Sequence, residues 1–328
     1  MSMRNQQILV LITGGAGFAG RYLAQLLRKN GRKVYIFDHN PLSEKGEAWE
    51  EIEEHYIIDL TQTKDLRKRL KSIRPAEIFH LAGKANVKHS WYGESETYLT
   101  NVIGVVNLMC AIRDTGLRSN LLIISSGEVY GQVPDSEQPI TEKRSPAPRS
   151  PYAGSKLCQE IAALQLARSL KGKTVIVRPF NHIGPGQRLG FVTADFAHQI
   201  ARIEHKLQEP LIHVGNLDAR RDFTDVRDMV EGYVKALEFG TSGDVINLCS
   251  GKTWSIKEIL DYMTSLSSVD ITVRVDPERF RPSDINLLQG NHDYMTRLSQ
   301  WNPELDIADT LTDIINYWRK QVSLETVT

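Results

Sequence analysis

Short, continuous runs of apolar residues alternate with longer amphipathic stretches through the first half of the chain. Such runs are typical of strands buried on both faces of a sheet, and the stretches between them have helical spacing. We predict strands at residues 8–12, 33–37, 77–81, 121–124 and 174–178, and helices at residues 21–29, 97–114 and 152–170. This alternation predicts an α/β fold with a Rossmann-type, doubly wound parallel sheet, which binds ligands at the carboxyl ends of its strands.

The pattern becomes less regular after residue 178, where the prolines and glycines of "PFNHIGPGQ" interrupt it. The pattern predicts helices at residues 194–205 and 310–320 and one ending at residue 237, and strands near residues 210–214 and 244–248. We therefore expect residues 1–178 to form the first domain. Residues 179–328 are expected to form mainly a smaller α/β lobe that binds the substrate, interleaved with returns to the main sheet.

Composition and charge narrow the classes of partner. The 328 residues contain 40 Lys and Arg against 40 Asp and Glu, so no net field favours nucleic acid or an anionic membrane. The apolar run at residues 8–12 is too short for a signal peptide or a membrane span, which favours a cytoplasmic protein. The three cysteines lack paired spacing, so we expect buried free thiols, no disulfide and no metal site.

A glycine-rich loop, "ITGGAGFAG", links the first predicted strand to the first predicted helix. Its glycines satisfy G-x-x-G-x-x-G and, from residue 15, G-x-G-x-x-G. This spacing allows a tight turn and lets a pyrophosphate approach the backbone at the positive end of the helix. We therefore predict that NADPH or NADH is bound by a set of loop residues: Gly14, Gly17, Phe18, Ala19 and Gly20.

Asp38 ends the second predicted strand, about 20 residues after the loop, where a carboxylate can accept hydrogen bonds from the adenosine ribose. Its charge also repels a 2′-phosphate, which favours NADH, although Arg21, Arg32 or His39 nearby can weaken that preference. Asp59 and Leu60 are expected to face the adenine; the alternative for this pair is an ordinary helix cap.

Two hydroxyls and a carboxylate follow the predicted strand at residues 121–124 in "SSGEVYG", and "YAGSK" comes soon afterwards. Tyr152 and Lys156 lie four residues apart, so they share one face of a helix. An ammonium beside a phenol favours the phenolate, so we expect a lowered pKa for Tyr152. Ser126, at the end of the strand, can hold a carbonyl oxygen against that phenol. These three residues predict redox chemistry at an alcohol or ketone carbon.

The motifs "TGGAGFAG", "HLAG", "SSGEVYG", "SPYAGSK" and "RDFTDVRD" resemble the extended short-chain dehydrogenase/reductase superfamily, in its nucleotide-sugar modifying branch. The resemblance covers nearly the whole chain. It implies an N-terminal NAD(P) domain, a catalytic triad of Ser126, Tyr152 and Lys156, and contact of Lys156 with the nicotinamide ribose. Leu81 and Ala82 of "HLAG" join the expected cofactor contacts.

"RPFNHIGPGQ", "GFVTADFAHQIARIE" and "RPSDINLLQGN" are more specifically similar to GDP-4-keto-6-deoxy-D-mannose reductases, which make GDP-D-rhamnose. The similarity implies hydride transfer from NADPH or NADH to the C4 ketone of a GDP-linked 4-keto-6-deoxyhexose. It also implies a set of substrate-binding residues: Lys84, Ser90, Ser126, Glu128, Asn181, Arg221, Arg281 and Asp284. Family members dimerise through two helices per subunit, which here correspond to residues 97–114 and 152–170.

Glu128 keeps other functions open. Sugar-nucleotide 4,6-dehydratases carry a glutamate two places after the hydroxyl residue as the base at C5, and Glu128 has that position. The residues after "HLAG" also depart from the hydroxyls of related reductases, which leaves the hexose open. GDP-mannose 4,6-dehydratase and nucleotide-sugar 4-epimerase therefore stay as alternatives. A non-catalytic binding subunit is the alternative from another class, although Ser126, Tyr152 and Lys156 are all present.

Overall fold

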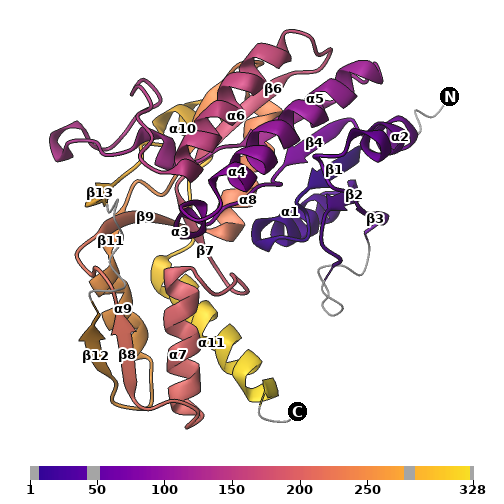
Figure 1. The fold of residues 1–328 in the computed structure, drawn as a ribbon. Coiled ribbons are helices and arrows are strands. Elements are labelled where there is room, and N and C mark those ends of the chain that lie inside the picture. The colour runs from indigo at the N-terminus through magenta and orange to yellow at the C-terminus, as the bar shows by residue number, and fades with distance from the viewer. Residues whose placement is uncertain (1–6, 43–51, 277–284, 326–328) are drawn as a thin grey trace.

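A seven-stranded parallel sheet forms the centre of the molecule (Figure 1). The computed structural model describes residues 7–42, 52–276 and 285–325. In spatial order the strands are β10 (Val245–Leu248), β6 (Thr174–Pro179), β5 (Asn120–Ile124), β4 (Glu77–His80), β1 (Leu9–Thr13), β2 (Lys33–Asp38) and β3 (Glu54–Ile57). The predicted doubly wound α/β fold is confirmed.

The direction of winding reverses between β1 and β4. From β1 the chain proceeds outward to β2 and β3, and then returns to β4 on the other side of β1. Thr13 is in register with Phe37 and with His80, so three strands end at the same level. The loops that follow β1 and β4 diverge from this point, which leaves a crevice where such sheets bind ligands.

Helices cover both faces of the sheet. One face packs against α2 (Thr63–Ile73), α5 (Gly104–Asp114) and α6 (Pro151–Ala167), and the other against α1 (Phe18–Lys29), α8 (Val226–Phe239) and α10 (Asp293–Ser299). In α1, Leu23, Ala24 and Leu27 are fully buried, and their spacing places them on one side of the helix. Burial of that apolar side fixes the glycine loop over the end of β1.

Two helical segments differ from the sequence-based prediction. The single helix expected at residues 97–114 consists of α4 (Glu94–Tyr98), the π-helical turn η2 (Leu99–Ile103) and α5. Helix α2 was predicted only as part of a polar span, because Leu66, Leu70 and Ile73 are its only buried residues. Shorter helical pieces are α3 (Val87–Ser90), η3 (Gly127–Tyr130) and η4 (Asp135–Glu137).

The remaining elements form a smaller lobe beside the carboxyl edge of the sheet. Its two small sheets contain β7 (Asn181–Ile183), β9 (Arg220–Asp225), β11 (Thr253–Ser255) and β13 (Leu287–Leu288), and β8 (Leu211–Val214) with β12 (Thr272–Val275). Its helices are α7 (Val192–Glu204), α9 (Ile256–Ser265) and α11 (Ile307–Glu325). Helices α7 and α11 lie side by side (Figure 1) and share an apolar core with α9.

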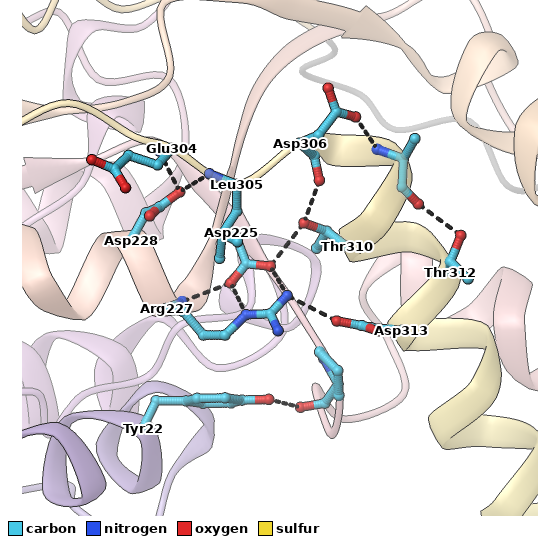
Figure 2. A network of polar contacts seen from close by, with 12 residues as sticks. Tyr22, Asp225, Arg227, Asp228, Glu304, Leu305, Asp306, Thr310, Thr312 and Asp313 are labelled. Carbon is cyan, nitrogen blue, oxygen red and sulfur yellow. Dashed lines mark hydrogen bonds and ion pairs between the residues drawn. The ribbon is translucent and has the colours of Figure 1, made fainter. Parts of the chain in front are cut away.

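A polar network joins this lobe to the helices of the sheet (Figure 2). The Asp225 carboxylate caps α8 by accepting from the Arg227 N–H, accepts two hydrogen bonds from the Arg227 guanidinium and accepts a fourth from the Thr310 hydroxyl at 2.8 Å. Arg227 also forms an ion pair with Asp313 of α11 at 2.9 Å. On α1, the Tyr22 hydroxyl donates to the Pro185 carbonyl at 2.8 Å. These contacts attach α11 to α8, and the loop after β7 to α1.

The cysteines differ from the expectation of buried thiols. All three are free, but only Cys249 is buried; Cys110 is half-buried and Cys158 is exposed on α6. Sequence spacing carried no information on which face of a helix each thiol occupies. Within the described ranges, none of the helices has the length and apolar character needed to cross a bilayer.

Candidate active site

A cavity of about 1750 Å³ lies between the carboxyl edge of the sheet and the smaller lobe. Most of the residues singled out from the sequence line it. They are Gly14, Gly17, Phe18, Ala19, Gly20, Asp38, Asp59, Leu60, Leu81, Ala82, Lys84, Ser126, Glu128, Tyr152, Lys156, Asn181 and Arg221. Arg281 and Asp284 lie outside the described residues. Residues far apart in sequence therefore meet in one cavity large enough for two ligands.

The glycine loop forms a backbone cradle at the start of α1. Gly14 has φ +72°, and a Cβ there would lie 2.5 Å from the backbone nitrogen of Ala82. A Cβ on Gly20 would lie 2.4 Å from the carbonyl oxygen of Gly15. Only glycine satisfies this packing, which leaves the N-terminal turn of α1 open to a pyrophosphate. The cradle therefore fits a dinucleotide cofactor.

Asp38 closes the ribose end of this cradle. Its carboxylate accepts hydrogen bonds from the backbone N–H of Ala16 and of Asn40, each at 3.0 Å, and the exposed His39 ring lies 3.3 Å away. Arg21 donates instead to the Pro185 carbonyl. Arg32 lies at the opposite, amino end of the sheet, where it forms an ion pair with Glu77 at 3.2 Å. Arg32 therefore does not face the ribose, contrary to the sequence-based expectation.

Ser126, Tyr152 and Lys156 meet where β5 ends against the first turns of α6. Ser150 caps this helix through a hydrogen bond from the Ala153 N–H at 3.1 Å, and Pro151 occupies its first turn. The Ser126 hydroxyl is hydrogen-bonded to the Tyr152 phenol. The three side chains line the cavity but are almost fully buried. Only a little water therefore remains for a bound ligand to exclude from them.

The pKa of Tyr152 is not lowered as expected. Its pKa is raised to about 12, mainly by burial and also by the Glu128 charge, while the Ser126 hydrogen bond opposes both effects. The Lys156 ammonium donates to the Ile124 carbonyl at 2.8 Å, and burial lowers the pKa of this lysine to about 8. The phenol is thus protonated at neutral pH, which suits a proton donor better than a proton acceptor.

Glu128 lies on η3 and faces the same cavity, where its charge acts on Tyr152. Lys84 forms an ion pair with Glu96 at 2.8 Å, and both side chains are well exposed. Asn181 on β7 is paired with Phe223 of β9, the strand that carries Arg221. The lobe therefore contributes an amide and a guanidinium opposite the sheet edge.

Ser90 does not line the cavity, contrary to its predicted contact with the sugar. It is buried beneath α6, where its hydroxyl donates to the Val87 carbonyl at 2.7 Å and accepts from the Tyr152 N–H at 3.2 Å. The bond from the Tyr152 N–H joins α3 to the start of α6, and the bond to Val87 within α3 orients the hydroxyl, so Ser90 supports the backbone of Tyr152.

Asn101 is a site residue that sequence reasoning missed. It is fully buried in the π-helical turn, accepts from the Lys84 N–H at 2.8 Å and donates to the Lys84 carbonyl and to the Ser155 hydroxyl. These contacts fix the turn after β4 beside Lys156. The only signal in the sequence was an asparagine inside the apolar stretch "LTNVIGVV".

His80, at the end of β4, is fully buried and shares a hydrogen bond with the Thr13 hydroxyl at 2.8 Å. Burial, with Lys156 nearby, lowers its pKa to about 3, so the ring is neutral. Among the residues that the structure describes, no group of three or more His, Cys, Asp and Glu side chains is placed to hold a metal ion.

Comparisons with known proteins agree with this geometry. A family described as GDP-mannose 4,6 dehydratase matches residues 11–314. The GDP-6-deoxy-D-mannose reductase of Pseudomonas aeruginosa is 34% identical over 316 residues, which cover 96% of this chain and 99% of the reductase. The GDP-mannose 4,6 dehydratase of Drosophila melanogaster is 27% identical, over 94% of this chain and 85% of that protein.

Solved structures give the same result. RMD from Pseudomonas aeruginosa complexed with NADPH has a TM-score of 0.83 and 32% sequence identity, over 96% of this chain and 98% of that chain. The UDP-glucose 4-epimerase of Thermus thermophilus in complex with NAD has a TM-score of 0.85 and 26% identity, over 95% and 99% of the two chains. Both similarities extend across the sheet and the smaller lobe.

Proposed function

The chain belongs to the GDP-mannose 4,6 dehydratase family, and we propose that it reduces the C4 ketone of GDP-4-keto-6-deoxy-D-mannose to give GDP-D-rhamnose. It is an NAD(P)-dependent oxidoreductase of the nucleotide-sugar type. The observation that carries the proposal is the protonated Tyr152 phenol, hydrogen-bonded to Ser126 at the end of the glycine cradle. A phenol that holds its proton at neutral pH is suited to quench the alkoxide formed when a ketone accepts hydride.

NADH or NADPH supplies the hydride when bound in the cradle. In this proposal the Ser126 hydroxyl orients the ketone oxygen, and Tyr152 donates its proton to the oxygen as negative charge develops there. Lys156, as an ammonium, stabilises the phenolate that this transfer leaves behind. Asp38 contacts the adenosine ribose and favours NADH, because its charge repels a 2′-phosphate.

The substrate side of the proposal uses the smaller lobe. Asn181 and Arg221 hold the diphosphate, since a partly desolvated diphosphate needs N–H or cationic partners. Arg281 and Asp284 are proposed to close around the diphosphate and ribose, and Lys84 to face the sugar. The division into residues 1–178 for NAD(P) and residues 179–328 mainly for the nucleotide sugar belongs to the same proposal, as does a cytoplasmic location.

A homodimer is also proposed, through the helices at residues 94–114 and α6. What supports it is a group of exposed apolar side chains on these helices: Tyr98, Leu99, Ile103 and Ile161. Exposed apolar side chains on two neighbouring helices suit burial by a second copy. Sedimentation of the wild type against Ile161→Lys tests it, because a charge on this face is expected to give monomers.

A second candidate is 4,6-dehydration, which the position of Glu128 favours. The glutamate faces the cavity and its charge acts on Tyr152, which supports a role as the base at the carbon next to C4. Dehydration and 4-epimerisation both return the hydride to the sugar and consume no external NADH or NADPH.

The deciding experiment follows reduced-nicotinamide absorbance with NADH or NADPH, while a known dehydratase produces the keto sugar from GDP-mannose in the same cuvette. Oxidation that requires the keto sugar supports the reductase, and Glu128→Gln is then expected to retain most of the activity. Conversion of GDP-mannose without the added dehydratase, abolished in Glu128→Gln, would assign dehydration instead. Binding of both ligands without turnover would point to a non-catalytic subunit.

A further inference from the structure

Three consecutive residues at the end of β5 each form a hydrogen bond with a different turn of α6. The Ile124 carbonyl accepts from Lys156, the Ser125 hydroxyl donates to Glu160, and the Ser126 hydroxyl is bonded to Tyr152. Positions 152, 156 and 160 are four residues apart, so the three side chains form one row along the helix. The row extends one turn beyond the predicted catalytic residues.

Glu160, the third member of the row, is a buried carboxylate whose oxygens are occupied by donors. Besides the Ser125 hydroxyl, it accepts two hydrogen bonds from the Arg178 guanidinium, at 2.9 and 2.6 Å. Glu160 is 2% exposed and Arg178 is 6% exposed. A buried pair with this bidentate geometry holds its charges in fixed positions.

Arg178 extends the contacts to the turn that carries Glu128. Its guanidinium lies 4.8 Å from the centre of the Tyr130 ring, and the Tyr130 hydroxyl donates to Asn247 on β10 at 2.7 Å. The Asn247 N–H in turn donates to Glu142 at 2.9 Å. The pair therefore lies between α6, β5, β6 and η3, all of which form the wall behind Tyr152.

Charges around Lys156 come from several elements. Burial lowers its pKa, and the Glu160 charge opposes that effect. His80 on β4 is neutral, since its own pKa is lowered to about 3, and Tyr152 on α6 is protonated. Glu128 on η3 acts on Tyr152. Glu160 is thus the negative charge that favours the ammonium form of Lys156.

We propose that Glu160, fixed by Arg178, is a positioning residue that keeps Lys156 cationic and holds the Ser126 end of β5 against Tyr152. The functional part of this inference rests on the proposed reductase activity. Glu160 touches neither the cavity nor the reacting atoms in this proposal. It acts through Lys156 on one side and through Ser125 on the other.

The test measures the titration of Lys156 directly, in protein labelled with 13C at the lysine ε-carbon and without any ligand. The Lys156 resonance is assigned by its loss in Lys156→Met. In Glu160→Gln, which keeps the shape and an acceptor for Ser125, the midpoint is expected to fall by about one pH unit or more. An unchanged midpoint would overturn the proposal.

Two further variants control for damage to the fold. Glu160→Gln leaves the Arg178 charge buried without a partner, so Glu160→Gln/Arg178→Gln is made as a neutral pair of similar volume. Glu204→Gln breaks a comparable bidentate pair with Arg319 in the smaller lobe and is expected to leave the Lys156 midpoint unchanged. Failure of both Glu160 variants to fold would show a structural role only and would contradict the proposal.

Turnover gives the second readout. The kcat of Glu160→Gln is expected to be several-fold low at pH 7.5 and to approach the wild-type value near pH 6, where Lys156 is protonated in both proteins. A deficit that is the same at every pH would indicate structural damage instead. If the wild type shows no reductase activity while the Lys156 midpoint still shifts, the proposed reaction fails but the role of Glu160 stands.

Discussion

The edge of the large sheet and the smaller lobe use buried polar groups in different ways. At the sheet edge, Asp38 is the last residue of β2, Ser126 lies two residues after β5, and both line the cavity. In the lobe, the Asp222 carboxylate is fully buried and accepts from the N–H groups of Ser250, Gly251 and Gly290 and from the Ser250 hydroxyl. Strand topology brings the first group to one edge of the sheet, whereas in the lobe a buried carboxylate holds an irregular stretch of backbone. Substitutions at the sheet edge should therefore alter the rate of catalysis, and substitutions of buried carboxylates in the lobe should alter the free energy of unfolding.

The largest effect on the edge side is expected for Tyr152→Phe. Removing the phenolic proton donor should lower kcat about 1000-fold, because in the proposed reaction the Tyr152 phenol beside Ser126 donates the proton to the ketone oxygen. The melting temperature and the affinity for NADH should change little, since the ring remains. Stopped-flow and steady-state assays measure kcat; a loss smaller than ten-fold would assign proton donation elsewhere.

On the lobe side, Asp222→Asn should destabilise the protein by roughly 2 kcal/mol, since the new amide NH2 would face N–H donors that now share a carboxylate. Urea denaturation measures this change. The exposed Asp218 in the same lobe provides the control, because Asp218→Asn is expected to stay within about 0.5 kcal/mol of the wild type. Equal effects of the two substitutions would remove the contrast between edge and lobe.

Raising the pH should separate rate from stability. Burial lowers the pKa of Lys156 to about 8, so its ammonium is present below that pH and is lost above it. The rate should fall by up to about ten-fold per pH unit above pH 8. Between pH 8 and 9 the unfolded chain keeps this proton and the folded protein loses it, so this lysine causes no loss of stability. Parallel loss of rate and of melting temperature over this range would disagree with the prediction.

The smallest effect is expected for Asp38→Ser, which removes the proposed charge beside the ribose and the acceptor of the Ala16 N–H but keeps the glycines of the cradle. The ratio of kcat/KM for NADPH to that for NADH should rise roughly five-fold. Arg32→Gln, at the amino end of the sheet, should leave the ratio unchanged. A shift of equal size in both variants would mean that the preference is not set at the ribose.

Local pattern was enough to predict six of the seven strands of the large sheet; β3 (Glu54–Ile57) was not predicted, because it is an edge strand with no buried residue. Gly14, Asp38 and the Tyr152–Lys156 spacing are readable because each lies at a fixed offset from a strand or helix. Helix α2 was not predicted because it buries only three apolar residues, which is too few to mark a helix within a polar stretch. Asn101 and the Glu160–Arg178 pair depend on contacts between distant segments, which periodicity does not encode.

The pKa of Tyr152 shows the same limit in energetic terms. Spacing on a helix indicated that Lys156 lies near the phenol, and this alone favoured a lowered value. The extent of burial is a tertiary property; it is the largest cause of the raised pKa, and the Ser126 hydrogen bond opposes it. The Ser90 prediction was wrong for a related reason, since its hydroxyl is satisfied by the backbones of Val87 and Tyr152 before any ligand binds.

The packing of α11 against α7 also affects how the chain matures during synthesis. The sheet receives its last strand, β10, only after α7, β8 and β9 have been made, and α7 is covered only when residues 307–325 have left the ribosome. Neither the large sheet nor the smaller lobe can therefore complete its apolar core before residue 248 has been synthesised. The lobe completes its core last. Fluorescent or affinity fusions that delay release of α11 should accordingly prolong exposure of the apolar side of α7 to chaperones.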